Sequence, residues 1–391
     1  MRSCTFTQLD IVNMPSEIIT NPKVETVLRR EQGNASVHGF RFDSIGFSEV
    51  SETVFNQWCQ WQKNEVFRSP YFHPNYVACV DRVRDDVRVG LIYDGDKLVG
   101  IFPYQGVRMA EPVGGAINDY HGVISAGNLK LTQEEIIRLA GVKKFQFHSW
   151  LNPDESMQRY IYSPDQAYVA DISAGAEPFI AEIAKQSTAV RRHGQKARKM
   201  MREVGSLRLE IDSKDTELLE WTIQKKREKY QRTGVVDYFG RTWSRDMLHE
   251  ILQQSGADFS GMLSVLYAGD QVVATHFGMR SRNVLHYWFP VYDLEYSRYS
   301  PGTELFLQIV RQSESLGIDI VDFGYGYDYY KTRLTNRRED VVRGCVDFNP
   351  LRRTVNKTFD AFVSRIKSSS LKEPVKKAVR TFNPGAGQPK I

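Results

Sequence analysis

At 391 residues, the chain is longer than a single hydrophobic core usually supports, so its length predicts two domains. With 41% hydrophobic, 25% charged and 12% aromatic residues, its composition excludes a largely disordered chain. The net charge of +5 is concentrated at the carboxyl end, because residues 351–391 carry ten Lys and Arg against two Asp and Glu. We interpret this basic tail as a solvated extension, with binding to an acidic membrane surface or to nucleic acid as the alternatives.

Cysteine spacing and hydropathy indicate the cellular compartment in which the protein is expected. Cys4, Cys59, Cys79 and Cys345 form no CxxC pair and stand near no His/Cys cluster, which predicts free thiols and no metal site. No uninterrupted run of about 18 apolar residues occurs, and the amino terminus lacks the apolar core of a secretory signal. We therefore expect a cytoplasmic protein, with a position at the inner membrane surface as a variant of that expectation.

The first part of the chain predicts an extension, a helix and a hairpin. Residues 1–40 show no sustained hydrophobic period, so we expect an extension with little regular structure, followed by a helix over 50–65. VRVGLIYDGDKLVGIFPYQGVR and, further on, GMLSVLYAGDQVVATHFGMR each predict two strands around a tight turn, at Gly95 and Gly269. Tyr-x-Gly-Asp stands at both turns, which we interpret as an internal repeat. Ordinary hairpin chemistry, in which Gly supplies a positive φ, is the alternative.

A cationic helix is predicted between the two hairpins. After a linker near residues 152–165 and a strand AYVADIS, the segment 185–205 places apolar residues on one helical face and arginines and lysines on the others. A solvated face is one interpretation. A ligand that carries phosphate, such as a nucleotide sugar, a lipid phosphate or tRNA, is the other.

The last third predicts an antiparallel meander joined to one βαβ crossover. After two further helices and the second hairpin, NVLHYWFPVYD predicts a strand, a helix begins at Ser300 and Pro301 and ends at Gly317, IDIVDFG predicts a buried strand, and YYKTRL predicts a short helix. Such a sheet can open where the meander meets the crossover. The amino end of the helix would then face an anionic pyrophosphate.

The segment SPGTELFLQIVRQSESLGIDIVDFGYGYDYYKTRL resembles the signature of the CelD-like branch of the GNAT superfamily. In that branch a Ser-Pro-Gly start, a helix, a Gly-x-x-x-x-Asp-Phe strand and a Tyr-Lys pair follow in this order. The matching positions here are Ser300, Pro301, Gly302, Gly317, Asp322, Phe323, Gly324, Tyr330 and Lys331. The resemblance covers roughly residues 42–348 and includes the tandem halves that Fem-type peptidoglycan aminoacyltransferases also have.

This resemblance implies an α/β (α+β) fold of tandem GNAT-like domains with mixed, mainly antiparallel sheets flanked by helices. The implied division is an extension (1–40), an N-terminal GNAT-like half (41–165), a C-terminal acyltransferase half (166–350) and the basic tail (351–391).

The implied function is transfer of an acyl group, acetyl in the first instance, from acyl-CoA to an amine of an amino sugar or related precursor in surface polysaccharide biosynthesis. The acceptor would be a small molecule or a lipid-linked glycan, the basic tail would contact a membrane surface, and no metal would be required. Fem-like transfer from aminoacyl-tRNA to a cell-wall precursor, and a noncatalytic module that binds a nucleotide or acyl-CoA, are the alternatives. Nucleic acid is an expected partner only as tRNA.

The resemblance and the predicted strand ends point to particular site residues. In GNAT-type transfer the amine attacks the thioester directly, so the protein supplies positioning, a proton acceptor and stabilisation of the oxyanion. The catalytic candidates are Lys331, Asp119, His276, Tyr330, Asp328 and Tyr287. His276 as a core histidine, Tyr287 as a packing residue and Asp119 as a loop cap remain open. We expect Lys331→Ala and Asp119→Ala each to abolish transfer without lowering stability.

The implied donor site is the start of the helix at Ser300, Pro301, Gly302 and Thr303. GNAT enzymes ordinarily bind pyrophosphate here with Gln/Arg-x-x-Gly-x-Gly/Ala. Pro301 stands where the first glycine belongs and has no N–H to donate, so the sequence predicts an atypical phosphate site.

Overall fold

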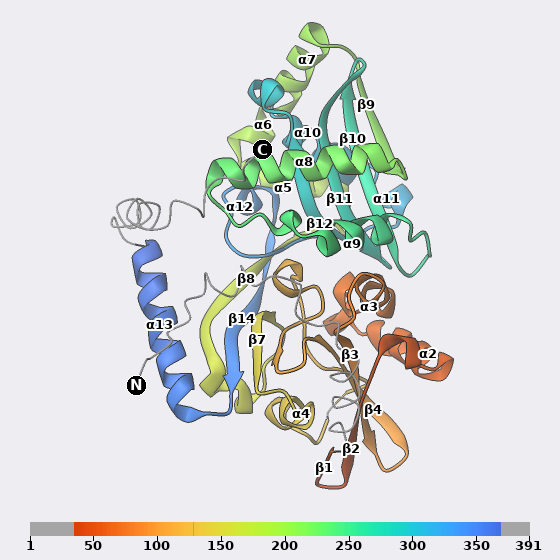
Figure 1. The fold of residues 1–391 in the computed structure, drawn as a ribbon. Coiled ribbons are helices and arrows are strands. Elements are labelled where there is room, and N and C mark those ends of the chain that lie inside the picture. The colour runs from red at the N-terminus through yellow and green to blue at the C-terminus, as the bar shows by residue number, and fades with distance from the viewer. Residues whose placement is uncertain (1–34, 128, 369–391) are drawn as a thin grey trace.

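The computed structural model describes residues 35–127 and 129–368 (Figure 1). Residues 1–34 of the predicted extension, with Cys4, and residues 369–391 of the basic tail lie outside the described residues. The last residues of the predicted extension are not irregular, because the first two strands begin at Ala35 and Phe40 and pair with each other. In the described part of the chain, Cys59, Cys79 and Cys345 are free thiols.

Fourteen strands are present in the described residues: β1 (Ala35–Val37), β2 (Phe40–Ile45), β3 (Val87–Asp94), β4 (Lys97–Gln105), β5 (Met109–Ala110), β6 (Ile124–Ser125), β7 (Lys144–Trp150), β8 (Ile161–Asp171), β9 (Leu207–Ser213), β10 (Ser260–Ala268), β11 (Gln271–Ser281), β12 (Val284–Tyr292), β13 (Ile320–Tyr325) and β14 (Arg337–Asp347). The α-helices are α2 (Glu52–Gln62), α3 (Pro74–Asp81), α4 (Gln133–Leu139), α5 (Ala176–Gln186), α6 (Thr188–Arg191), α7 (His193–Glu203), α8 (Thr216–Thr233), α9 (Thr242–Leu252), α10 (Pro301–Arg311), α11 (Ser313–Leu316), α12 (Lys331–Leu334) and α13 (Pro350–Ser368). Short 3-10 turns η1 (Phe47–Glu49), η2 (Glu65–Phe67), η3 (Pro70–Phe72), η4 (Gly115–Ile117), η5 (Glu155–Tyr160), η6 (Tyr238–Gly240) and η7 (Leu294–Tyr299) connect them.

The strands form two sheets. A five-stranded sheet has the order β1-β2-β3-β4-β6, and a nine-stranded sheet has the order β5-β7-β14-β8-β13-β12-β11-β10-β9. Named strands pair in parallel only at β12–β13 and β5–β7, and all other pairs are antiparallel. The predicted fold of mixed, mainly antiparallel sheets flanked by helices is therefore confirmed.

The two predicted hairpins are confirmed and share one turn geometry. In β3–β4 the register shifts between Ile92 and Tyr93, and in β10–β11 it shifts at the equivalent place, between Leu266 and Tyr267. The turn glycines adopt nearly the same left-handed conformation, with φ of 59° at Gly95 and 57° at Gly269. A side chain would strain this conformation, which explains Gly at both turns. The two hairpins lie in different sheets, and the internal repeat stays a prediction.

The linker predicted near residues 152–165 is wrong, because η5 and the start of β8 occupy most of it. β8 contains Pro164, although proline rarely lies in a central strand. At Pro164 β8 pairs with β14, whereas β13 pairs with β8 only from Ala167 onward, so this end of β8 is an edge. The predicted domain boundary at residue 165 stays a prediction, but the nine-stranded sheet contains strands from both sides of it.

Helices cover both faces of the nine-stranded sheet where it contains β10 to β13 (Figure 1). One face packs against α8 and α9 through Leu219, Ile223 and Leu248, in a core shared with the N-terminal part of the chain. The other face packs against α5 and α10 through a second core that includes Phe179 and Phe306. The placement of a side chain on one face or the other therefore decides which part of the chain it meets.

Two predicted helices are interrupted. The cationic helix predicted over 185–205 consists of α6 and α7, separated at Arg192, whose φ of −96° and ψ of 3° depart from helical values. The helix predicted from Pro301 to Gly317 divides into α10 and α11, and Gly317 ends it in the expected left-handed conformation, with φ 63°. The first part of the predicted basic tail forms α13.

Candidate active site

The parallel strands β12 and β13 separate after a short stretch of pairing. They pair at Val284 with Ile320, at Leu285 with Val321 and at His286 with Asp322, and the pairing ends there. Beyond this point β12 continues to Tyr292, paired with β11 on its other side, while β13 stays paired with β8 as far as Tyr325. This is the opening that the join between meander and crossover predicts. A cluster of ionisable side chains lies at the point where the strands separate.

His286 is fully buried between two carboxylates at this point. Its Nε2 atom lies 3.1 Å from Oδ2 of Asp119, and its Nδ1 atom lies 4.0 Å from Oδ2 of Asp322. The second distance is too long for a hydrogen bond, so that attraction is electrostatic. Burial alone lowers the pKa of His286, but Asp119 and Asp322 outweigh burial and raise the pKa to about 9. His286 is therefore a cation at neutral pH.

Asp322 is held by groups from both parts of the chain. Its Oδ1 atom accepts hydrogen bonds from the hydroxyl of Tyr120 at 3.0 Å and from the backbone N–H of Gly324 at 2.7 Å. The Tyr71 hydroxyl donates to the carbonyl of Ile117 and lies 3.2 Å from Nε2 of His286. These contacts join the loop before β6, η3 and the C-terminal sheet into one buried polar network.

Asp119 reaches the cluster from a loop that its neighbour Asn118 fixes. The Asn118 side chain donates to the carbonyl of Val113 and accepts from the N–H of Tyr120, both at 2.8 Å. The Asp119 carboxylate lies directly over Gly324, where an added Cβ would come within 2.0 Å of Asp119 Oδ2. Only glycine fits beneath it. The Asp119 side chain is 17% exposed, so a ligand can reach this carboxylate although His286 is buried.

Lysines from two helices complete the cluster. The Lys331 ammonium donates to the carbonyls of Tyr325 at 2.7 Å and Gly324 at 3.3 Å, which leaves one N–H for another partner. Burial lowers the pKa of Lys331, although nearby carboxylates, Asp119 first, oppose the shift. On α8, burial together with the charges of Lys229 and Lys331 lowers the pKa of Lys226 to about 7. A lysine with such a pKa can hold or release a proton at neutral pH.

Asp328 and Tyr330 belong to the turn that leads into α12. The Asp328 backbone carbonyl accepts from the N–H of Lys331 at 3.0 Å, so Asp328 starts the helix that carries Lys331. The Tyr330 ring lies 6.0 Å from Phe323 and under the Lys229 ammonium at 5.7 Å. Burial raises the pKa of Tyr330, and the charge of Asp328 adds to the shift. Four of the six predicted catalytic residues, Lys331, Asp119, Tyr330 and Asp328, thus come together.

The other two predicted catalytic residues lie on the opposite face of the sheet. The rings of His276 and Tyr287 stack at 4.0 Å with an angle of 3° between their planes, and Tyr287 packs 5.6 Å from Phe306 of α10. Neighbouring residues of a strand point to opposite faces, so Tyr287 faces away from the side that His286 faces. Burial, and then the charge of His286, lowers the pKa of His276 to about 3. His276 is a neutral core residue in this structure.

The amino end of α10 carries the predicted donor site. Ser300 has a left-handed backbone, with φ 56°, and its carbonyl accepts from the N–H groups of Thr303 and Glu304 at 3.0 and 3.2 Å. These two N–H groups are therefore occupied, and Pro301 has none. A cation from α7 stands at this end instead, because the Lys196 ammonium donates to the Ser300 hydroxyl at 2.7 Å. Gly302 lies beside the Tyr292 ring, whose Cδ1 atom would be 3.4 Å from a Cβ added at Gly302.

Residues 187–332 match the family model described as acetyltransferase (GNAT) domain. The chain therefore contains a GNAT domain. The match begins just before α6, ends within α12 and includes His286, Asp322 and Lys331. Asp119 lies outside it. The GNAT domain thus supplies most of the cluster, and the preceding part of the chain supplies the partly exposed carboxylate of Asp119.

Distant structural similarities extend beyond the GNAT domain. A tandem GNAT protein from the clavulanic acid biosynthesis pathway is 10% identical, with 80% of this chain and 99% of that chain covered and a TM-score of 0.45. FemX is 9% identical, with 69% of this chain and 89% of that chain covered and a TM-score of 0.44. N-myristoyltransferase from Saccharomyces cerevisiae is 10% identical, with 81% and 84% covered and a TM-score of 0.40. No curated protein sequence matches the chain.

No catalytic role is predicted from the sequence for three charged residues of the cluster, Asp322, His286 and Lys226, all of which lie in the GNAT domain. Asp322 stands out only as part of the signature, His286 stands beside the predicted Tyr287 in HYWF, and Lys226 lies in the charged run KKREK. The sequence signal that could have helped is strand alternation. It places His286 and Tyr287 on opposite faces of the strand, but it does not show which face meets Asp119.

Metal ligands and membrane spans are absent from the described residues. In residues 35–127 and 129–368, no three His, Cys, Asp or Glu side chains come together in a way that could hold a metal ion. Among the helices of the same ranges, none is both long enough and apolar enough to cross a bilayer.

Proposed function

We propose that the chain is an N-acyltransferase that moves an acyl group, acetyl in the first instance, from acyl-CoA to an amine of an amino sugar or related precursor of a surface polysaccharide. The observation that carries the proposal is the Asp119–His286–Asp322 arrangement at the point where β12 and β13 of the GNAT domain separate. It provides a partly exposed carboxylate held by a buried cation where an acceptor amine could meet a thioester.

The donor's phosphates would lie at the amino end of α10. Backbone donors are scarce there, because Pro301 has no N–H and Ser300 already accepts from Thr303 and Glu304. Charge can compensate, since Lys196 stands at Ser300 and the neighbouring α7 presents Arg198 and further basic side chains. The site is therefore suited to phosphates through side-chain cations more than through backbone N–H groups.

In the proposed reaction the acceptor nitrogen attacks the thioester carbonyl carbon, so that a C–N bond forms and the C–S bond breaks. Asp119 would accept a hydrogen bond from the amine, and the His286 cation at 3.1 Å would hold that carboxylate in place. The amine's proton would pass to Lys226, whose pKa of about 7 suits a proton acceptor at neutral pH. The remaining N–H of Lys331 would stabilise the negative charge that develops on the carbonyl oxygen.

One observation favours a second function. α7 is strongly cationic and carries few carboxylates, as a helix that contacts tRNA would be, so Fem-like transfer from aminoacyl-tRNA is the competing proposal. The same chemistry at Asp119 would serve both donors. The two proposed functions differ only in the donor, acyl-CoA or aminoacyl-tRNA, that binds the surface formed by α7 and α10.

Release of CoA thiol from acetyl-CoA in the presence of amino sugars, including nucleotide-linked ones, tests the proposal. Thermal stabilisation by CoA esters but not by aminoacyl-tRNA supports the first function, and the reverse supports the second. In the first case Lys331→Met should lower kcat by about 100-fold, while Lys97→Gln, in the exposed β3–β4 turn, should leave it unchanged. Binding of either donor with no turnover on any amine would favour a noncatalytic module.

We also propose that α13 contacts an anionic membrane surface, where a lipid-linked acceptor would be found. Leu351 and Val355 are 79% and 66% exposed on this helix, next to the basic residues Arg352 and Arg353. Flotation with anionic vesicles should weaken in Leu351→Gln/Val355→Gln. Equal flotation of both proteins would exclude this contact.

A further inference from the structure

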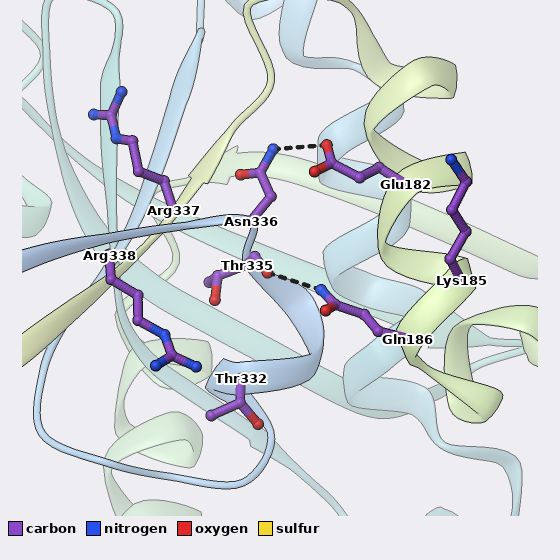
Figure 2. A pocket seen from close by; sticks show the side chains of 8 residues that line it. All are labelled: Glu182, Lys185, Gln186, Thr332, Thr335, Asn336, Arg337 and Arg338. Atoms are coloured by element: carbon purple, nitrogen blue, oxygen red, sulfur yellow. Dashed lines mark hydrogen bonds between the residues drawn. The ribbon is translucent and has the colours of Figure 1, made fainter.

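A polar pocket of about 340 Å³ lies between α5 and the segment that joins α12 to β14, and none of the residues that line it belongs to the proposed substrate sites. Figure 2 shows Lys185 and Gln186 of α5 on one side, and Thr332, Thr335 and Arg338 on the other. This volume is at the lower end of the range for small-molecule sites. The proposed acyl transfer does not use the pocket.

Two cations of the pocket have no carboxylate partner. No Asp or Glu of the described residues forms an ion pair with Lys185 or Arg338. Arg338 contacts two neutral groups, Gln166 Oε1 at 3.3 Å and the Tyr168 ring at 5.5 Å. Arg337 differs, because it is paired with Asp171 at 2.8 Å and with a second carboxylate, and in Figure 2 it points away from Thr332. The pocket therefore presents unneutralised positive charge.

Other groups that line the pocket are mainly free hydrogen-bond acceptors. The Thr332 hydroxyl donates to the carbonyl of Tyr329 at 3.0 Å, and the Thr335 hydroxyl donates to the carbonyl of Lys331 at 2.8 Å. Each hydroxyl has thus used its one proton, and its oxygen can only accept from a ligand. Gln186 donates to the Thr335 carbonyl at 3.2 Å and keeps its own carbonyl oxygen free.

The carboxylate of Glu182 is the one acid among the residues that line this pocket. Its Oε2 atom accepts from the amide of Asn336 at 3.0 Å, as Figure 2 also shows. Glu182 thus contacts a neutral amide and forms an ion pair with neither Lys185 nor Arg338. Its other oxygen is a further acceptor for a ligand hydroxyl.

We infer that this pocket binds a sugar phosphate or a similar group that carries both phosphate and hydroxyls. Lys185 and Arg338 would bind the phosphate, since ionised donors and phosphate oxygens form strong, charge-assisted hydrogen bonds. The oxygens of Thr332 and Thr335 would accept from the ligand's hydroxyls. A neutral sugar would leave the two cations without a partner, and a bare phosphate would leave the hydroxyl oxygens unused.

The pocket is connected to the proposed active site through α12. Thr332 directly follows Lys331, and the Thr335 hydroxyl holds the Lys331 carbonyl. A ligand in the pocket would therefore brace the helix that positions Lys331. The ligand can be a distant part of the acceptor or a separate effector. The effect of the ligand on Lys331 rests on the proposed function, whereas binding of the ligand to the pocket does not.

Calorimetric titration with glucose 1-phosphate, with inorganic phosphate and glucose as comparisons, tests the inference. Glucose 1-phosphate should bind more tightly than either, and Lys185→Gln/Arg338→Gln should weaken it about tenfold or more. Lys97→Gln removes an exposed cation elsewhere and should bind like the wild type. Unchanged affinity in the double variant, equal binding of glucose, or no binding to the wild type would overturn the inference.

Turnover measurements distinguish the two sources of the ligand. If the phosphate belongs to the acceptor, glucose 1-phosphate competes with the acceptor, and the double variant raises KM only for phosphorylated acceptors. If the ligand is an effector, glucose 1-phosphate changes kcat without competing. Asp119→Asn should abolish turnover and leave the titration unchanged, so failure of the proposed function and failure of the pocket are separate results.

Discussion

Replacing Asp119 by asparagine removes the charge of the carboxylate nearest to His286 and keeps its shape. The wild-type carboxylate lies 3.1 Å from Nε2 of the fully buried imidazole, so it directly stabilises a charge that burial disfavours. In Asp119→Asn only Asp322 remains, at 4.0 Å. We expect the pKa of His286 to fall to its ordinary value or below, and the protein to lose stability at neutral pH.

The pKa of His286 gives the size of this loss. A rise from 6.5 to about 9 corresponds to about 3 kcal/mol, at about 1.4 kcal/mol for each pKa unit. Because the folded-state pKa is raised, this stabilisation is complete below the unfolded value of 6.5 and is lost as the pH rises through about 9. Asp119→Asn should therefore be less stable than the wild type by up to about 3 kcal/mol near pH 6. The two proteins should converge above pH about 10.

Urea unfolding followed by tryptophan fluorescence, repeated across this pH range, measures the difference. Asp96→Asn, in the exposed β3–β4 turn, is the matched control and should follow the wild type at every pH. A stability difference that stays constant with pH would refute the reasoning, because it would show that the His286 charge is not its cause. This expectation replaces the one drawn from the sequence, in which removing Asp119 would cost activity alone.

Three further changes test other parts of the site. Lys226→Met should abolish the rise of kcat/KM with pH near 7, and equal pH–rate profiles would exclude Lys226 as proton acceptor. The same change should stabilise the protein by about 2 kcal/mol near pH 6, where the partly desolvated Lys226 charge costs the folded state most. Lys196→Ala should raise the KM for acyl-CoA about tenfold with kcat unchanged, and an unchanged KM would move the phosphates elsewhere. His276→Phe should keep wild-type turnover and at least the wild-type melting temperature, because both ring nitrogens of His276 are buried without a hydrogen-bond partner. Loss of turnover in this variant would show that His276 takes part in catalysis.

Local patterns explain why the two hairpins and many elements of the C-terminal half could be predicted. Strand alternation and the turn glycines Gly95 and Gly269 indicate both hairpins, and Gly317 indicates the end of a helix, because these signals depend on neighbours in the chain. The signature from Ser300 to Lys331 gives the order of the last elements for the same reason. The start of β8, with Pro164, was not predictable in this way, because whether a strand is central or at an edge depends on its partners.

The site was predictable only in part. The sequence points to both Lys331 and Asp119, which the structure brings into one cluster, but it does not point to His286, although His286 stands next to the predicted Tyr287. Alternation shows that residues 286 and 287 point to opposite faces of β12. It cannot show that one face meets the loop of Asp119 and the other meets α10.

The sequence by itself determined the elements of the GNAT domain, the atypical start of α10 at Pro301 and the excess of positive charge on α7, since these follow from local spacing and composition. Only the tertiary structure decided that Asp119, His286 and Asp322 meet, and that the charge of Lys331 helps to lower the pKa of Lys226. The reason is physical. Ionisation and hydrogen bonding in a buried cluster depend on which distant segments pack together, and a single sequence does not state that packing.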